Sequence, residues 1–377
     1  SFVKGKVDSA INKIKEIKEK GGAEDLTQKR NEAKQEMLAK LNEFKQKGIY
    51  SDSVLQKMQQ AYNNRCEELD KAGNASQIDL VEGYFFTDLE SFKTIVEEVS
   101  EDLVNHEENP ENLLPTIKEV ENAIDLYEDD TAFSPSDKDF AVNSDYKILL
   151  NYYADYKIGQ LKTRYENVKN QYSYKNYSKI TAKLEDASSN ASKAKNKAEV
   201  VKAVTDAEEY VENSDNVKKN VRVITTKSGQ YNIEITSNKN YTFAPDAYVS
   251  ASDYRFYAVK KNVNRILKKI DTGDNDKKLA VKFYINITVI GEDGKKVTEY
   301  EEGTVFTVKI HNTNVTNKLK GDSLLKVVYY YSGNMEGYDS ENNTLSDKFP
   351  SSIENEGEYL MFTTTHFSPF AICGTGS

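Results

Sequence analysis

The spacing of apolar residues changes about 215 residues into the chain. Before this point apolar side chains recur every three or four positions, as at Val7, Ile11 and Ile14, and such a period indicates amphipathic helices. After about residue 220 apolar and polar residues alternate, most clearly over residues 281–289, which indicates half-buried strands. The pattern predicts a multidomain α plus β fold, with N-terminal helical bundles followed by a C-terminal antiparallel β-sandwich of Ig-like type.

Residues 1–82 are predicted to form a three-helix bundle. The helical period runs over residues 3–47, and Gly21-Gly22 is expected to divide this stretch into two helices because glycine disfavours helix interiors. Gly48 ends the second helix, and a third helix extends as far as Gly73. Short connections of this kind are typical of helices that run up, down and up.

Residues 83–215 are predicted to form a second helical bundle. Thr87, with Glu90 three residues later, matches a capping box and is expected to begin its first helix. Longer helical segments follow over residues 144–172 and 178–212, and the second of these is rich in alanine and lysine. These segments extend the helical part to the point where the apolar period changes.

Residues 216–374 are predicted to form a β-sandwich module. Its alternating runs are short, and turns such as Glu292–Lys295 separate them. A short helix is expected over residues 263–270. The runs with strand period are 221–225, 231–235, 281–289, 304–310, 324–331, 359–364 and 370–373.

The last hundred residues contain a series of specific motifs. A strand over residues 284–289 precedes the turn Asp293-Gly294-Lys295, and a second strand follows over Gly303–Ile310. The chain closes with Phe362–Ala371, which matches F-T-T-x-H-F-S-x-[YF]-A. With these motifs, residues 275–374 resemble a C-terminal module of cell-surface proteins from Gram-positive gut Firmicutes of the clostridial and ruminococcal type. The helical half is similar to the surface helical repeats of such proteins in composition only.

The resemblance implies a location more than a reaction. In such proteins the module often lies near the C-terminus, shortly before a spacer and a wall-sorting signal. No sorting signal is present in this sequence, so we expect attachment to the cell wall through an anchor that lies outside it. The implied localisation is extracellular, at the cell surface or in the cell wall.

Composition and charge narrow the possible partners. The chain has 51 basic and 61 acidic residues, a net charge of −10, and its lysines are interleaved with acids. Nucleic-acid binding depends on clustered cations, so a nucleic-acid partner is excluded. No run of 18 apolar residues occurs, so no membrane span is expected. Cys66 and Cys373 fall in different predicted domains, and no disulfide between them is expected.

The sequence lacks the common catalytic motifs. It contains no nucleophile elbow, P-loop, dinucleotide fingerprint or zinc-protease motif, so a non-catalytic protein is expected. His366, in the closing motif, suggests a metal ligand or an acid–base group, because imidazole titrates near neutral pH. The alternative, which we favour, is a structural side chain that fixes the last strand by hydrogen bonds to the backbone, because no second His or Cys lies near it at ligand spacing.

Two acidic loops are weak candidates for a calcium site, and no other cofactor is expected. Oxygen-rich ligands suit Ca²⁺, but neither loop has the glycine and glutamate positions of an EF-hand, so ordinary acidic turns are the favoured interpretation. The first loop contains Asp271, Asp274 and Asp276. The second contains Asp339, Glu341, Asn343 and Asp347.

The aromatic content is dominated by tyrosine. The chain has 25 Tyr, 15 Phe and no Trp, and Tyr152, Tyr153 and Tyr156 lie close together on one predicted helix. Exposed tyrosines stack on sugars or anchor protein partners, so these three are weak candidates for a binding face. The alternative, which we favour, is that they pack in a thin bundle.

These observations favour a non-catalytic bacterial cell-surface protein, with a structural and adhesive helical stalk and a binding module. The expected partner is a host or matrix protein or a glycan. The alternative is a glycan-binding component of a polysaccharide-harvesting system. Exposed aromatic side chains gathered in a concave groove would favour a binding module.

Overall fold

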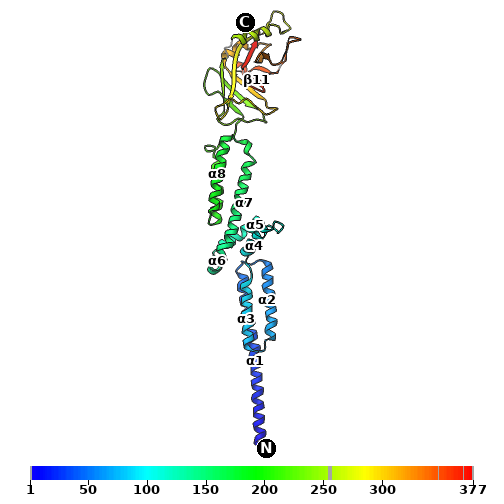
Figure 1. Cartoon of the computed structure of the whole chain (residues 1–377), viewed down its shortest axis with the longest axis vertical. Coiled ribbons are helices and arrows are strands. Elements are labelled where there is room, and N and C mark those ends of the chain that lie inside the picture. The colour runs from blue at the N-terminus through cyan, green and yellow to red at the C-terminus, as the bar shows by residue number, and fades with distance from the viewer. Residues whose placement is uncertain (1, 254–256, 347, 368, 376–377) are drawn as a thin grey trace. The chain divides into compact units, whose positions relative to one another are not determined.

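The computed structural model describes residues 2–253, 257–346, 348–367 and 369–375. Helices fill the first part and antiparallel sheets the second, so the predicted fold class is confirmed (Figure 1). The last helix of the first part, α9, ends at Glu212, and the first strand, β1, begins at Val223. Residue contacts divide the chain into two compact units, Ser1–Leu161 with Asp186–Asp206, and Lys162–Glu185 with Ala207–Ser377.

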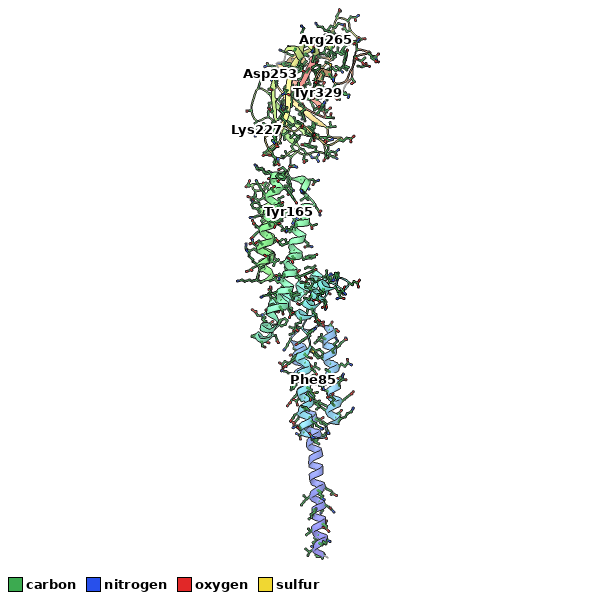
Figure 2. The ribbon with its side chains drawn as sticks, in the orientation of Figure 1. Phe85, Tyr165, Lys227, Asp253, Arg265 and Tyr329 are labelled. Atoms are coloured by element: carbon green, nitrogen blue, oxygen red, sulfur yellow. The ribbon has the colours of Figure 1, made fainter. Side chains whose placement is uncertain are left out.

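The first bundle consists of α1 (Phe2–Gln46), α2 (Asp52–Lys71) and α3 (Ala75–Ser91). Ser51 and Asn74 cap α2 and α3, because their side-chain oxygens accept hydrogen bonds from backbone N–H groups in the first turn. Figure 2 shows Phe85 among these helices, and its ring is fully buried. The core contains Met37, Leu41, Phe44, Met58, Leu69, Ile78, Phe85 and Leu89.

Two predictions about this bundle are corrected. The backbone of α1 stays helical through Gly21-Gly22, because each glycine disfavours a helix by only about 0.5–1 kcal/mol. The bundle ends after Ser91 rather than at residue 82, because Ile78, Phe85 and Leu89 of α3 supply one side of its core.

The predicted capping box at Thr87 is also corrected. The Thr87 hydroxyl lies inside α3 and donates a hydrogen bond to the carbonyl of Gly83 at 3.1 Å. The next helix, α4 (Ile95–Glu108), begins after Thr94, whose Oγ1 accepts from the N–H of Glu97. Both threonines precede a glutamate three residues on, and only the second stands at a helix start.

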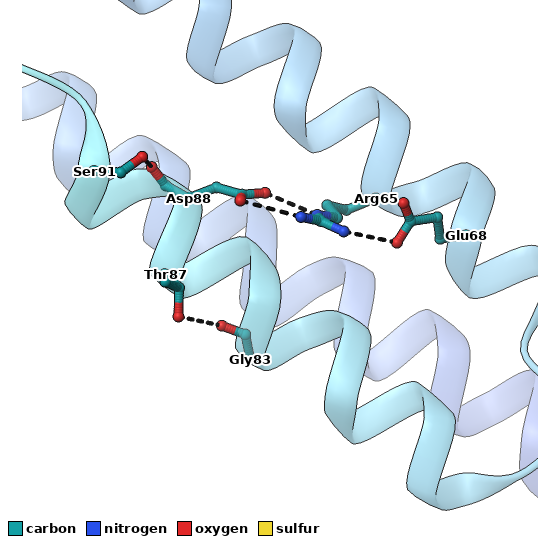
Figure 3. Close-up of polar contacts among 6 residues, drawn as sticks. All are labelled: Arg65, Glu68, Gly83, Thr87, Asp88 and Ser91. Atoms are coloured by element: carbon teal, nitrogen blue, oxygen red, sulfur yellow. Dashed lines mark hydrogen bonds and ion pairs between the residues drawn. The ribbon is translucent and has the colours of Figure 1, made fainter.

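Arg65 connects α2 to α3 through a two-pronged contact with Asp88. Its Nε and second guanidinium nitrogen lie 2.8 and 3.1 Å from the two carboxylate oxygens, and its remaining nitrogen lies 2.9 Å from Glu68 (Figure 3). The hydrogen bonds to Asp88 raise the pKa of the Arg65 guanidinium further above neutrality. Such bidentate pairs specify geometry, so Arg65 sets how α2 and α3 align.

The helices that follow are shorter than predicted. Asn196 divides the predicted segment 178–212, because its Oδ1 accepts from the N–H of Glu199 and begins a new helix. Among the described residues, no helix has the length and apolar content that a bilayer span requires. The elements are α5 (Ile117–Glu128), α6 (Pro135–Ala141), the π-turn Val142–Tyr146, α7 (Lys147–Glu166), the 3₁₀ turn Lys169–Gln171, α8 (Tyr174–Ser192) and α9 (Lys197–Glu212).

The sandwich is built from two antiparallel sheets. Within the described residues each sheet has five strands, so the predicted antiparallel two-sheet arrangement is present, with strand numbers that differ from the four plus three of an Ig constant-type domain. One sheet has the order β1 (Val223–Thr225), β2 (Asn232–Ser237), β5 (Phe306–His311), β11 (Tyr359–Thr364) and β10 (Ser351–Glu354). The other has the order β3 (Tyr248–Asp253), β4 (Ala280–Ile290), β12 (Pro369–Gly374), β6 (Lys326–Tyr331) and β7 (Asn334–Met335).

Three smaller elements complete the sandwich unit. These are α10 (Tyr257–Leu267), α11 (Thr313–Leu319) and a short hairpin of β8 (Tyr338–Asp339) and β9 (Thr344–Leu345). The predicted turn at Glu292–Lys295 is present, with Gly294 at a φ of 75°.

The sandwich has a core on each side of its second sheet. Between the two sheets, alternate residues of β11 and β5 meet those of β4 and β12, and the rings of Phe362 and Phe370 lie 5.1 Å apart. On the opposite face of the second sheet, Val263 and Leu267 of α10 pack against Val328 and other apolar residues. The strand β12 is therefore buried along its whole length.

The second unit also contains the helix ends next to the sandwich. The backbone N–H of Asn220 donates to the carbonyl of Gln171 at 2.8 Å, and the N–H of Lys218 donates to Oδ1 of Asn176 at 2.9 Å. Asn176 is buried, so its amide is held away from water. These bonds join the α7–α8 turn to the segment that leads into β1.

Phe362→Ala is expected to lower the free energy of unfolding of the sandwich by about 3–5 kcal/mol, because it removes a fully buried ring from the core between the sheets. Hydrogen exchange on the whole chain measures this: peptides from β5 and β11 should lose protection, and peptides from α1–α3 should keep it. Val223→Ala, at an exposed position of β1, is the control and should change little. Unchanged protection in Phe362→Ala would contradict the packing.

Glu82 should make the stability of the first bundle depend on pH. Burial, and then a hydrogen bond with the carboxyl of Glu36 on α1, raise the pKa of Glu82 from an ordinary 4.5 to about 7. The folded state then holds the proton more tightly than the unfolded chain, so this contribution to stability is full below pH 4.5 and is lost as the pH rises through about 7.

Glu82→Gln, which resembles the protonated carboxyl, should therefore raise the urea midpoint of the first bundle at pH 8 and change it little at pH 5. Protection of α1 and α3 peptides against hydrogen exchange across a urea series reports this midpoint. Glu90→Gln, at an exposed position of the same helix, is the control. An equal effect of Glu82→Gln at both pH values would show that Glu82 shares no proton with Glu36.

Candidate functional site

A groove of about 890 Å³ opens on the sandwich where the central strand β12 begins. Its volume lies within the range of small-molecule sites, about 300–1,000 Å³. Four segments contribute to it: part of α10 and β4, the return of the hairpin after β4, the end of β6 with its turn, and the residues just before β12. The lining residues are Val259, Asn262, Asn286, Thr288, Lys296, Val297, Thr298, Tyr300, Tyr329, Tyr330, Tyr331, Ser332, Gly333, His366, Phe367 and Pro369.

The groove lies where β4 and β6 run past the first residue of β12. Pro369 pairs with Asn286 of β4, and Phe370 pairs with Tyr329 of β6. Beyond these pairs β4 and β6 both continue, and in the described part of the chain no strand register lies between them. Proline lacks the N–H that a ladder needs, so it suits the first position of a strand. Side chains of the flanking segments line the space that remains.

One wall of the groove is a cluster of aromatic rings that reaches into the core. The ring of Tyr300 lies 4.7 Å from that of Phe306 and 5.9 Å from that of Phe367, and Phe306 lies 4.8 Å from Phe367. The Tyr300 hydroxyl donates to the carbonyl of Val297 at 3.1 Å. Burial raises the pKa of Tyr300, so its hydroxyl stays protonated at neutral pH.

His366, next to Phe367 in the chain, also lines the groove. Its ring lies 4.1 Å from that of Tyr329 and 5.7 Å from that of Phe349, and its Nε2 lies 2.7 Å from Oε2 of Glu336. Lys348 lies 3.6 Å from the other oxygen of Glu336. A side-chain carboxylate, rather than the expected backbone bonds, therefore holds the His366 ring.

Tyr331 stands at the rim of the groove. It is the last residue of β6, before the turn that Ser332 and Gly333 form with φ values of 52° and 92°. Its side chain shares a strand face with Tyr329, and the two rings are nearly parallel, 25° apart with centroids at 6.4 Å. Tyr331 is 62% exposed, whereas Tyr329, labelled in Figure 2, is half-buried.

Polar side chains also line the groove, from the face of the second sheet that packs against α10, opposite to the face of Tyr329 and Tyr331. Asn286 and Thr288 are two residues apart on β4, so they share one face of the strand. Asn262 of α10 and Lys296 of the returning hairpin also contribute to the lining. The groove therefore combines aromatic faces with amide and hydroxyl groups, which suits a ligand that is apolar on one side and polar on another.

The first calcium candidate is a loop closed by its own backbone. Oδ1 of Asp271 accepts from the N–H of Gly273 at 2.8 Å, and Oδ1 of Asp274 accepts from the N–H of Asp276 at 3.0 Å. Lys277 lies 4.0 Å from the other oxygen of Asp274. Across the described residues, no three His, Cys, Asp or Glu side chains gather as a metal site would need.

The second calcium candidate is the tip of the β8–β9 hairpin. Asp339 accepts hydrogen bonds from the Asn342 side chain and from the N–H groups of Glu341 and Asn342. These bonds, first the one from Asn342, lower the pKa of Asp339. Asn343 accepts from the hydroxyl of Tyr338, and Asp347 lies outside the described residues.

The three tyrosines singled out on α7 do not form one face. Tyr153 is only 2% exposed and packs in the helical core, which corrects its candidacy as a binding residue. It lies on the inward stripe of α7 with Leu149 and Leu150. Tyr152 and Tyr156 are half-buried, and the Tyr156 hydroxyl accepts from the Gln160 amide at 3.1 Å.

The other two histidines have local partners. His106 Nδ1 lies 2.6 Å from the carbonyl of Asn112, beyond the end of α4. His311, at the end of β5, packs its ring 5.1 Å from that of Tyr359. Neither contributes to the groove.

Sequence reasoning missed Tyr300, Tyr329 and Tyr331 as site residues. The local signal is the run Tyr329-Tyr330-Tyr331 directly before a Ser-Gly turn. A strand that keeps an aromatic side chain up to its exposed end, where polar residues are usual, marks a surface contact.

Neither a scan of protein-family models nor a search of curated protein sequences finds a match to this chain.

The His366–Glu336 pair is expected to contribute about 0.2–1 kcal/mol to stability, because both side chains are about one-third exposed and water screens the charges. A double-mutant cycle with His366→Ala, Glu336→Ala and the double variant, followed by urea unfolding, measures this coupling. The more exposed pair Lys277–Asp274, at 4.0 Å, is the control and should show less coupling. No coupling between His366 and Glu336 would mean that ring stacking alone positions the imidazole.

Proposed function

We propose that this chain is an exposed, non-catalytic part of a bacterial cell-surface protein, in which helical bundles carry a β-sandwich that binds a partner. The groove is the observation that supports this proposal. It holds the exposed Tyr331 beside Tyr300 and Tyr329, which pack against the core. Large aromatic side chains at a surface are enriched where proteins recognise partners.

The resemblance of residues 275–374 to surface modules supports the location. The closing motif contributes buried Phe362 and Phe370 to the core, and His366 and Phe367 to the groove wall. The motif therefore serves both the stability of the sandwich and the shape of the groove. Attachment to the cell wall, through an anchor outside this sequence, remains part of the proposal.

The groove chemistry favours binding over hydrolysis. Its described lining offers rings, amides, hydroxyls and a lysine, whereas glycoside hydrolysis uses two carboxyls about 5–10 Å apart on either side of the bond. The partner is a host or matrix protein or a glycan. The second candidate function, a glycan-binding component of a polysaccharide-harvesting system, uses the same groove.

Beads coated with the whole chain are expected to adhere to immobilised matrix proteins, mucin or plant polysaccharide, and to leave the mass of the captured material unchanged. Tyr331→Ala should reduce this adhesion without altering the unfolding midpoint, because the side chain is exposed. Adhesion to none of these surfaces would contradict the proposal. So would a turnover that survives repurification and disappears in His366→Ala.

A further inference from the structure

We infer that the sandwich binds an acidic polysaccharide, whose anionic groups contact a cationic stripe of Lys261, Arg265 and Lys268 on the outer side of α10. This inference rests on the proposed function, since it names the chemical class of the partner. The charge of α10, its helical spacing, the burial of its apolar residues and the polar surface beside it support the inference in turn.

The segment that forms α10 departs from the mixed charge of the whole chain. Residues 257–270 contain five basic residues and no acidic one, whereas the whole chain has 51 basic and 61 acidic residues. All five are exposed, and within the described residues none of them forms an ion pair with an acid. These charges are therefore free to contact an external anion. The five residues are Lys260, Lys261, Arg265, Lys268 and Lys269.

The cationic stripe follows from the helical spacing. Lys261, Arg265 and Lys268 are four and three residues apart, so they lie on one side of the helix over about 10 Å of its length. Arg265, in the middle, is labelled in Figure 2. The helix dipole favours a cation at the C-terminal end, as at Lys268, but like charges three and four residues apart destabilise a helix. Helix stability alone therefore does not explain the stripe.

The apolar residues of α10 are used in the core. Val263, Leu267 and Ile270 are buried against the second sheet, on the side of the helix opposite to the cationic stripe. A helix that lies on a bilayer inserts apolar side chains beside its cations. In the described part of α10 no large apolar side chain is exposed for this purpose. The stripe therefore suits a polymer in solution better than a membrane surface.

Polar side chains continue from α10 onto the second sheet. Asn286 and Thr288 of β4 lie on the face of this sheet that packs against α10. Ser252 and Ser250 of β3 are paired with them, so their side chains share this face. Both serines are exposed. The surface next to the helix is therefore rich in amide and hydroxyl groups.

The groove joins this polar surface to α10. Asn262 of α10 lines the groove together with Asn286, Thr288 and Lys296. Lys296 is bridged to Ile290, two residues beyond Thr288 on β4, so it belongs to the same face of the sheet. Lys296 is exposed, so a further cation lies among the amide and hydroxyl groups.

This combination matches a polymer that carries both hydroxyls and negative charges. Amide and hydroxyl side chains donate and accept hydrogen bonds, as sugar hydroxyls do. Guanidinium and ammonium groups bind carboxylates and other oxyanions. Single-stranded nucleic acids stack their bases on exposed aromatic rings, and neither the cationic stripe nor the polar residues beside it are aromatic. An acidic polysaccharide is therefore the favoured partner.

Isothermal titration of the whole chain with a heparin hexasaccharide and with oligogalacturonate tests the inference. The comparisons are cellohexaose, a DNA duplex and phosphatidylglycerol vesicles. At least one acidic saccharide should bind more tightly than all three comparisons, and its affinity should fall as the salt concentration rises. The triple variant Lys261→Gln, Arg265→Gln, Lys268→Gln should weaken this binding about tenfold or more. Its urea midpoint should not fall, because the substitutions relieve repulsion between the cations.

A second triple variant keeps the charge of the stripe. Lys261→Arg, Arg265→Lys and Lys268→Arg exchange the two kinds of cation, so affinity should change less than about threefold. A loss as large as that of the glutamine variant would overturn the inference, because the charges would then not be what the ligand contacts.

The matched control removes three positive charges elsewhere in the same unit. Lys175→Gln, Lys218→Gln and Lys239→Gln replace exposed lysines outside α10 and should leave affinity nearly unchanged. An equal loss of affinity in this control would overturn the inference. So would full binding by the glutamine variant of the stripe, or tighter binding of DNA or vesicles than of both acidic saccharides.

Adhesion of coated beads separates the inference from the proposed function. Adhesion that is competed away by the acidic saccharide bound in the titration supports both. Adhesion that this saccharide leaves unchanged would overturn the inference and leave the proposed surface function standing. Tight binding in the titration without adhesion to any surface would overturn the adhesive function and leave the ligand class standing.

Discussion

The central strand of the second sheet is the element on which the sandwich depends. β12 lies between β4 and β6, and all of its residues are buried. Phe370 and Ile372 point into the core between the sheets, while Ala371 and Cys373 face the smaller core under α10. A strand buried on both faces must be apolar throughout, which explains why the last residues of the module contain no charge. Burial also raises the pKa of the Cys373 thiol, which keeps it protonated.

The strand period predicted the long, one-sided strands well. Residues 281–289 and 359–364 alternate because one face meets a core, and they became β4 and β11. Two edge strands were missed: β7 has only two residues, and β3 buries only Val249, so neither shows an alternating apolar pattern. In the helical half, the start of α3 was missed because Gly83 interrupts its signal, although its stripe of Ile, Phe and Leu is regular.

The groove was beyond sequence reasoning for a different reason. It arises where three strands, distant in sequence, end at different levels, and no local pattern encodes that difference. A binding site is expected to expose aromatic side chains in a concave surface. In the sequence, this expectation selected Tyr152, Tyr153 and Tyr156. Those side chains lie on a helix whose inward stripe needs Tyr153. The exposed aromatic residue instead lies at the end of β6. β12 does not extend beside this end, so the Tyr331 side chain stays exposed.

The bonds between the α7–α8 turn and the segment before β1 have a mechanical consequence. A bend between Glu212 and Val223 would break the bonds of Asn220 to Gln171 and of Lys218 to Asn176. Because Asn176 is buried, leaving its amide without a partner costs about 1–3 kcal/mol. These two hydrogen bonds therefore oppose bending of the segment between Glu212 and Val223. A force on the sandwich therefore reaches the α7–α8 turn through these hydrogen bonds as well as through the covalent chain.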